Sequence, residues 1–440
     1  MKRSHICIVL ISICGPMVCM QPSHSQVVPR VPLPNIPVLP TDDIDRAVDG
    51  AVDRVENRTA RELRNLRKTR LRALLRANRA AIETDPSGAP ILRSEVVALS
   101  PTPEALEQAR AAGFTVGRTR TLEGLELTIV VLQTPAGMST RRALDRLRAE
   151  DPSGTYDYNH LYIESGEPAS SPSQVPVAPA TAMRSSTRRV GLIDGGVQKS
   201  HPVFAGATVH EHGCSGGGMP SEHGTAVASL LVGEADPFRG VYPEAELFVA
   251  DVYCGLATGG AVDAIAEAFA WLSQQHVPVI NISLVGPPNA LLERMIRILT
   301  LKGHLVVAAV GNDGPRARPL YPAAYEDVVA VTGVDARNRV IVEACRGKHV
   351  DFAAPGSDMS AAIPDSKFGL IRGTSFASPI VAGLLAEELS RIDKQAADAA
   401  RANLISRAQD LGSRGRDKIY GHGLLGEHVR PSARLAGKSK

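Results

Sequence analysis

The second half of the chain contains five short apolar runs that few charges interrupt. After Arg188 they read RRVGLID, ELFVADVY, VPVINISLV, HLVVAAVG and VVAVTGV, and helical segments such as AVDAIAEAFAWLSQ and ALLERMIRILTLKG stand between them. Strands that are buried on both faces have continuous apolar runs, and strands that alternate with helices form parallel sheets. The pattern therefore predicts an α/β fold in which helices cover both faces of a mostly parallel sheet. In such sheets, functional groups gather at the carboxyl ends of the strands.

Polar residues stand at the ends of these runs or at the starts of helices. Asp194 ends VGLID, Asn312 follows VVAAVG, and His223 opens the helical segment SEHGTAVASLLVG. Ser375 lies in GTSFASPIVAG, where Pro379 marks the first turn of an apolar helix. Each residue alone would be an ordinary cap or turn residue. Their conjunction at one edge of one sheet, flanked by small residues, predicts a serine nucleophile with a base and an orienting acid.

These motifs resemble those of the subtilisin family of serine peptidases. DGG, HGTAVAS, NISL, AVGNDG and GTSFASP carry the resemblance, which covers roughly Arg188 to Gly426. It implies a subtilisin-like three-layer fold and a secreted serine endopeptidase that needs no cofactor and acts on peptides or proteins. Ser375 would attack the scissile carbonyl, His223 would move its proton, and Asp194 would orient the imidazole. Asn312 and the backbone N–H of Ser375 would bind the oxyanion.

The same resemblance implies that substrate lies extended between two edges of the protein. These edges are Ser283, Leu284 and Val285 on one side and Gly259 and Gly260 on the other. Val285 stands where the family usually has a glycine. We expect its branched side chain to narrow the primary specificity pocket or its neighbour and to favour small residues there.

Residues 91–163, which precede the catalytic part, have a different pattern of apolar and polar residues. It reads β-α-β-β-α-β if Phe114 to Arg120 is a strand, which is the split ferredoxin-like arrangement of an α+β domain. The segment resembles the inhibitory propeptides of the family and implies a precursor that binds its own propeptide domain in cis. Self-cleavage is expected between Tyr162 and the end of a Ser/Pro-rich linker over 164–187, before a catalytic domain over 188–430.

Residues 1–25 have the features of a secretory signal. Lys2 and Arg3 precede an apolar stretch from Ile6 to Val18, which is too short to span a membrane, and small residues follow it. A Pro-rich linker over 26–41 and an amphipathic helical segment over 42–90 come next. We expect export from a bacterial cell, to the periplasm or the medium, and no membrane contact beyond export. The formal net charge of +3 gives no reason to expect a nucleic-acid partner.

Removal of the signal would leave Cys214, Cys254 and Cys345. In an exported protein two of these three can pair. Cys214 and Cys254 are the candidate disulfide because both fall in loops that border the same predicted strands, and Cys345 would stay a free thiol.

No metal site is expected. His210, His212 and Cys214 form an HxHxC motif, but the remaining candidate ligand is His223, which catalysis claims, so a loop near the active site is the favoured interpretation. The segment between HGTAVASLLVGEA and ELFVADVY is short and lacks the Asn-rich loop that holds calcium in many members of the family.

Three alternative functions use a similar fold or a serine. A catalytically silent binding or assembly protein would have lost a member of the triad, and none is lost here. An α/β-hydrolase would have a Gly-x-Ser-x-Gly elbow and the order Ser, acid, His, whereas Ser375 comes last. A peptide ligase on the same scaffold stays open, because hydrolysis and aminolysis share the acyl-enzyme.

Overall fold

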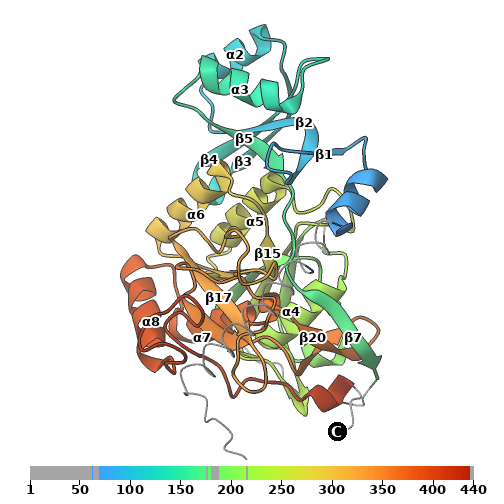
Figure 1. Cartoon of the computed structure of the whole chain (residues 1–440), viewed down its shortest axis with the longest axis vertical. Coiled ribbons are helices and arrows are strands. Elements are labelled where there is room, and N and C mark those ends of the chain that lie inside the picture. Colours follow the sequence, from blue (N-terminus) through green and yellow to red (C-terminus); the bar gives the residue numbers. More distant parts are fainter. Residues whose placement is uncertain (1–61, 63–68, 175–176, 180–187, 215–216, 437–440) are drawn as a thin grey trace, which may run out of the picture. The chain divides into compact units, whose positions relative to one another are not determined.

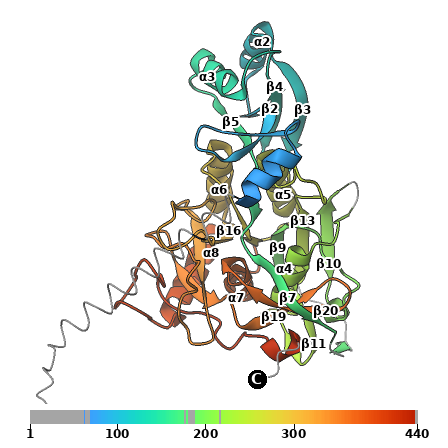
Figure 2. The same cartoon turned by 45° about the vertical axis from the view of Figure 1, so that its right-hand side comes forward.

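The centre of the fold is a sheet of parallel strands (Figures 1 and 2). The computed structural model describes residue 62 and residues 69–174, 177–179, 188–214 and 217–436. Seven parallel strands form this sheet in the order β10 (Val209–Gly213), β13 (Glu246–Asp251), β9 (Arg189–Asp194), β14 (Val279–Ile282), β16 (Leu305–Ala309), β17 (Val328–Val334) and β18 (Phe352–Pro355). The predicted mostly parallel sheet is confirmed.

Helices cover both faces of this sheet. One face carries α4 (Glu222–Val232) and α7 (Ser378–Glu388), and the other carries α5 (Val262–Gln274) and α6 (Ala290–Lys302). Neighbouring residues of a strand point to opposite faces, so Leu192 of β9 packs with α4 and α7 while Ile193 packs with α5 and α6. Helix α8 (Lys394–Arg407) packs against α7. The result is a three-layer α/β fold, as the resemblance to the subtilisin family implied.

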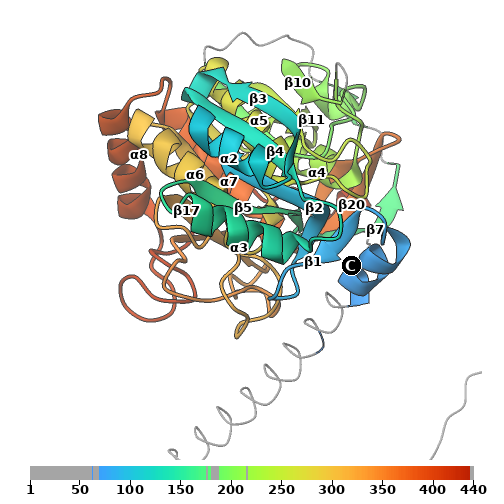
Figure 3. The same ribbon diagram turned by 90° about the horizontal axis from the view of Figure 1, so that it is seen from above.

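Residues 90–160 form a smaller α+β unit. Its elements are β2 (Pro90–Leu99), α2 (Pro103–Ala111), β3 (Thr115–Leu122), β4 (Leu127–Gln133), α3 (Thr140–Glu150) and β5 (Thr155–His160). Strands β3, β4, β2 and β5 pair antiparallel in that order, which gives the split β-α-β-β-α-β arrangement. Figure 1 shows its sheet lying between α2 and α3 on one side and α5 and α6 on the other, and Figure 3 shows the same layers from above, with α2 and α3 in front.

The contact between this unit and α5 is both apolar and charged. Val97 and Val131 belong to the same buried core as α5 and α6. The Arg118 guanidinium donates hydrogen bonds to the Glu95 carboxylate at 2.8 Å and to the Asp263 carboxylate of α5 at 2.7 Å. Because its apolar sheet face is buried here, the α+β unit is fixed against the α/β part through packing as well as through ion pairs.

Two expected segments differ from the structure. The helical segment expected over 42–90 is helical only at 69–77 in its continuously described part, and β1 (Ile82–Thr84) then pairs with the start of β2. The helix ends at residue 77, before a turn over 78–81. The Asp85 carboxylate accepts the N–H groups of Ser87 and Ala89, and Gly88 has a φ of 86°, so a tight turn joins β1 to β2. The expected signal at 1–25, the linker at 26–41 and residues 42–61 lie outside the described residues.

The expected Ser/Pro-rich linker over 164–187 contains strands. Strand β7 (Glu167–Ser173) pairs antiparallel with β20 (Lys367–Arg372), which also pairs with β19 (Met359–Ile363). Strand β8 (Ala178–Pro179) pairs with β11 (Glu234–Asp236), which β12 (Phe238–Arg239) joins on its other side. Composition alone predicted an exposed linker because it does not show that unpaired strand edges are available. No helix in the described ranges is long and apolar enough to cross a membrane.

Candidate active site

Asp194 and His223 form a buried pair at the carboxyl edge of the sheet. Asp194 ends β9, and His223 is the second residue of α4, which begins where the Ser221 Oγ accepts the N–H of Gly224 at 2.9 Å. The His223 Nδ1 lies 2.9 and 3.0 Å from the two carboxylate oxygens of Asp194, so Nδ1 carries a proton and donates it. The His223 Nε2 has no hydrogen-bond partner within the described part of the chain. A neutral imidazole held in this way accepts a proton at Nε2.

Ser375 lies in a 3-10 turn over Thr374–Phe376, directly before α7, and is fully buried. The Thr374 N–H donates to the Asn312 Oδ1 at 3.1 Å, and the Gly311 N–H donates to the Thr374 Oγ1 at 3.1 Å. These bonds fix the turn against the end of β16 and leave the Nδ2 of Asn312 available for another acceptor. The sequence analysis did not predict this role of Thr374. The one sequence feature that could have indicated it is the position of Thr374 directly before Ser375.

Six residues after β5, Leu161–Gly166, lie extended across this site. The Tyr162 N–H donates to the Gly260 carbonyl at 2.8 Å, and β6 (Ile163–Glu164) pairs antiparallel with β15 (Leu284–Val285). The Ser165 N–H then donates to the Ser283 carbonyl at 3.2 Å. The predicted edges at 283–285 and at Gly260 therefore both bind this segment, whereas Gly259 packs against Tyr253.

The segment brings one peptide bond to the reactive groups. A Cβ placed on Gly166 would lie 2.5 Å from the Ser375 Oγ and 3.0 Å from the His223 Nε2. On the other side of this bond, a Cβ on Gly373 would lie 3.0 Å from the Asn312 Nδ2 and 3.4 Å from the Ser165 carbonyl oxygen. Gly373 has a φ of 145°, so a side chain there is excluded by backbone conformation as well as by space. The serine hydroxyl and the imidazole thus lie beside Gly166, and the Asn312 amide and the Ser165 carbonyl oxygen both lie beside Gly373.

Three carboxylates raise the pKa of His223. Burial lowers the pKa of His223, but the charge and hydrogen bonds of Asp194, together with the charges of Glu164 and Glu222, outweigh burial and raise the pKa to about 9. Glu164 belongs to the extended segment, and one oxygen of its carboxylate, one of the Asp194 carboxylate and a ring nitrogen of His223 lie within 4.8 Å of one another. The segment therefore adds a negative charge that favours the protonated form of His223.

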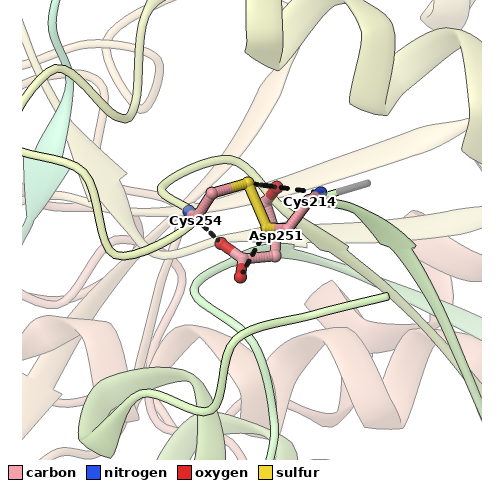
Figure 4. Close-up of side chains that lie close together, drawn as sticks. All are labelled: Cys214, Asp251 and Cys254. Atoms are coloured by element: carbon pink, nitrogen blue, oxygen red, sulfur yellow. Dashed lines mark hydrogen bonds between the residues drawn. A yellow bond between two sulfur atoms is a disulfide. The ribbon is translucent and has the colours of Figure 1, made fainter. Parts of the chain in front are cut away.

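A disulfide joins Cys214, at the end of β10, to Cys254 in the loop after β13 (Figure 4). Asp251 lies beside it and accepts the N–H groups of Tyr253 and Cys254 at 2.9 Å each. These contacts anchor the start of the loop that leads to Gly260, and so stabilise one edge of the cleft. Cys345 is buried outside this pair.

The HxHxC motif does not assemble as a metal site in this structure. His210 stacks on Phe248 and His212 stacks on Trp271, while the sulfur of Cys214 is bound in the disulfide. A disulfide sulfur supplies no thiolate, which a zinc site of this type requires. The zinc alternative is therefore set aside.

A parallel sheet with a buried Asp–His pair and a serine at its carboxyl edge defines the class of the protein as a serine endopeptidase. The chain belongs to the subtilase family, whose model matches residues 186–423.

Individual relatives agree with this assignment. Subtilisin Savinase of Lederbergia lenta is 32% identical over 263 residues, which are 57% of this chain and 93% of that protein. Subtilisin E of Bacillus subtilis (strain 168) is 30% identical over 289 residues, 63% of this chain and 75% of the relative. Among solved structures, one similar chain is fervidolysin from Fervidobacterium pennivorans, a keratinolytic enzyme related to subtilisin. It has a TM-score of 0.63 and covers 81% of this chain and 62% of its own. At 19% identity, this likeness shows the fold alone.

Proposed function

We propose that the chain is the autoinhibited precursor of an exported serine endopeptidase, and that Ser375 cleaves its own Ser165–Gly166 bond. The α+β unit and the extended segment would then be a propeptide that binds the catalytic part in cis. Export is supported by the signal-like pattern of residues 1–25.

One observation carries the proposal. The segment Leu161–Gly166 uses both cleft edges with its main chain and presents a single peptide bond to Ser375, His223 and Asn312. A substrate bound by strand addition is recognised in the same way. While the segment is in place, no other peptide can take these edges, so it supports both inhibition and self-cleavage.

The chemistry follows from the positions of the atoms. The Ser375 Oγ attacks the carbonyl carbon of Ser165 while His223 takes the hydroxyl proton at Nε2. Asp194 holds the Nδ1–H and stabilises the imidazolium that forms. The Asn312 Nδ2 and the Ser375 N–H bind the oxyanion, and His223 then returns the proton to the departing Gly166 amine. Water hydrolyses the acyl-enzyme by the same steps.

The test is the mass of the chain after synthesis. Residues 26–440 are expressed, and intact mass and N-terminal sequencing are followed with time. We expect loss of all residues up to Ser165 and a new N-terminus at Gly166. A chain that keeps its full mass under all conditions would instead support the catalytically silent binding or assembly protein. A peptide ligase would transfer the released acyl group to an added peptide amine, and the same measurement detects that product.

Self-cleavage is expected to depend on pH through His223. Since the base must be neutral and its pKa is raised to about 9, the rate should rise with pH and level off only above that value. Glu164→Gln removes one of the charges that raise the pKa, so its rate profile should shift to lower pH and its rate at pH 7 should rise, by roughly threefold or more. Quenched time points analysed by mass measure both profiles.

The matched control for this change is Glu107→Gln on α2, whose side chain is 70% exposed and pairs with Arg110. It should leave the pH profile unchanged. Identical profiles for Glu164→Gln and the wild-type chain would show that the segment does not influence the base.

A further inference from the structure

The side chain of Ser165 lies in a narrow space at the cleft. Its Oγ–H donates to the Ser283 carbonyl at 3.0 Å, the same oxygen that its N–H contacts, and Ser165 is only 5% exposed. Its carbonyl oxygen and the Asn312 Nδ2 both lie next to Gly373, at 3.4 and 3.0 Å from a Cβ placed there. The residue before the scissile bond is therefore held between the segment Ser283–Val285 and the residues after β16.

Two apolar side chains fill the space between these segments. A Cβ placed on Gly311 would meet the Leu320 Cδ1 at 2.5 Å and the Val285 Cγ1 at 3.4 Å. Leu320 is 9% exposed and Val285 is 2% exposed. Atoms at these distances leave no unfilled volume beside Gly311 for a longer substrate side chain.

Leu320 cannot easily withdraw from this position. Tyr321, the next residue, exchanges two hydrogen bonds with Gly286, at 2.8 and 3.0 Å, and Gly286 follows Val285 directly. The two side chains thus stand on segments that are bonded to each other, and the same core includes both. Inserting several carbons into a packed apolar site forces side chains or backbone to move.

We infer that Val285 and Leu320 close the pocket for the residue before the scissile bond, and that the enzyme cleaves after Ser, Ala or Gly and excludes aromatic and long aliphatic residues there. The inference rests on the proposed function, because it takes Ser165 as that residue. Leu320 is a specificity-determining residue that the sequence motifs did not indicate, and it adds a second wall to the narrowing expected from Val285.

The test uses the chain's own cleavage. Ser165→Ala and Ser165→Phe are compared in residues 26–440, in the wild-type background and in the Val285→Gly, Leu320→Ala and doubly substituted backgrounds. Intact mass gives the rate and N-terminal sequencing gives the bond. In the wild-type background, Ser165→Ala should process within about tenfold of the original chain, and Ser165→Phe at least about 100-fold more slowly at this bond.

Opening the pocket should reduce this discrimination. Leu320→Ala, Val285→Gly or both should speed processing of the Ser165→Phe chain at the same bond by about tenfold or more. Leu301→Ala is the matched control, because Leu301 lies on α6 with 66% of its surface exposed, and it should rescue nothing. Cleavage of the Ser165→Phe chain after another small residue would also support the inference.

The inference is overturned if the Ser165→Phe chain in the wild-type background is cut after the introduced phenylalanine as fast as the original chain is cut after Ser165. This comparison needs no substitution in the core, so it stands even if a pocket variant does not fold. Failure of the proposed function looks different: the original chain with Ser165 would then itself remain uncut. A second readout, cleavage of added Tyr-Ile-Glu-Xaa peptides with Ser, Ala or Phe as Xaa, should follow the same order.

Discussion

The Ser375→Ala chain is expected to keep its full mass under conditions in which the wild-type chain loses all residues up to Ser165. The substitution removes a single oxygen atom, which is buried and has no hydrogen-bond partner within the described residues. The fold should therefore be unchanged, and the loss should be one of chemistry alone. We expect a rate reduction of about a million-fold, the size known for loss of the nucleophilic serine in subtilisin itself.

Intact mass spectrometry over hours to days measures this loss, with thermal melting to compare the folds. Ser406→Ala, an exposed serine of α8, is the matched control and should process like the wild-type chain. Addition of processed wild-type enzyme shows whether the variant is still a substrate in trans. Cleavage of pure Ser375→Ala between Ser165 and Gly166 at a rate near that of the wild type would exclude Ser375 as the nucleophile.

Most of the fold could be predicted from the sequence because it depends on local patterns of residues. Continuous apolar strands such as VVAVTGV can be buried on both faces, and this forces helices onto both sides of the sheet. The family motifs also lie at strand ends and helix starts, where the chain has to turn and where small residues are needed. Asp194, His223, Asn312 and Ser375 were for this reason predictable as a group and come together in the structure.

Features that depend on contacts between distant segments were not predictable. Nothing in the Ser/Pro-rich composition of residues 164–187 shows that β20 offers an edge with which β7 pairs. Leu320 lies in a loop with no motif of its own, and its role follows from the bonds that hold Tyr321 against Gly286. The place of Glu164 beside His223 likewise depends on the register of the extended segment in the cleft, which is fixed by main-chain hydrogen bonds and not by residue type.

Under the proposed function, this register links inhibition to specificity. The extended segment would then be both the inhibitor and the first substrate, so its residues would have to fit the pockets that later substrates meet. Its buried Tyr162, whose hydroxyl donates to the Pro287 carbonyl at 2.6 Å, holds the segment in place, and the buried Ser165 donates its Oγ–H to the Ser283 carbonyl. The charge of Glu164 adds to that of Asp194 in favouring the protonated form of His223, which under the proposed function would slow cleavage at neutral pH. A tightly held but slowly cleaved segment is what a precursor needs in order to fold before it is activated.

Asp194→Asn is expected to lower the rate of self-cleavage by about ten-thousand-fold with the fold intact. The asparagine has nearly the same shape, and its carbonyl oxygen can still accept the Gly195 N–H that Asp194 accepts at 2.8 Å. Its NH₂ group would then face the His223 Nδ1, which must become an acceptor. The ring proton moves to Nε2, where it prevents that nitrogen from accepting the hydroxyl proton of Ser375. Loss of the negative charge should also lower the pKa of His223, so the remaining activity should no longer rise toward about pH 9.

Asp365→Asn, with 74% of its side chain exposed, is the control, and mass-based rates from pH 6 to 10 are the measurement. A variant that keeps a rate within tenfold of the wild type and an unchanged profile would mean that Asp194 sets neither the tautomer nor the charge of the base.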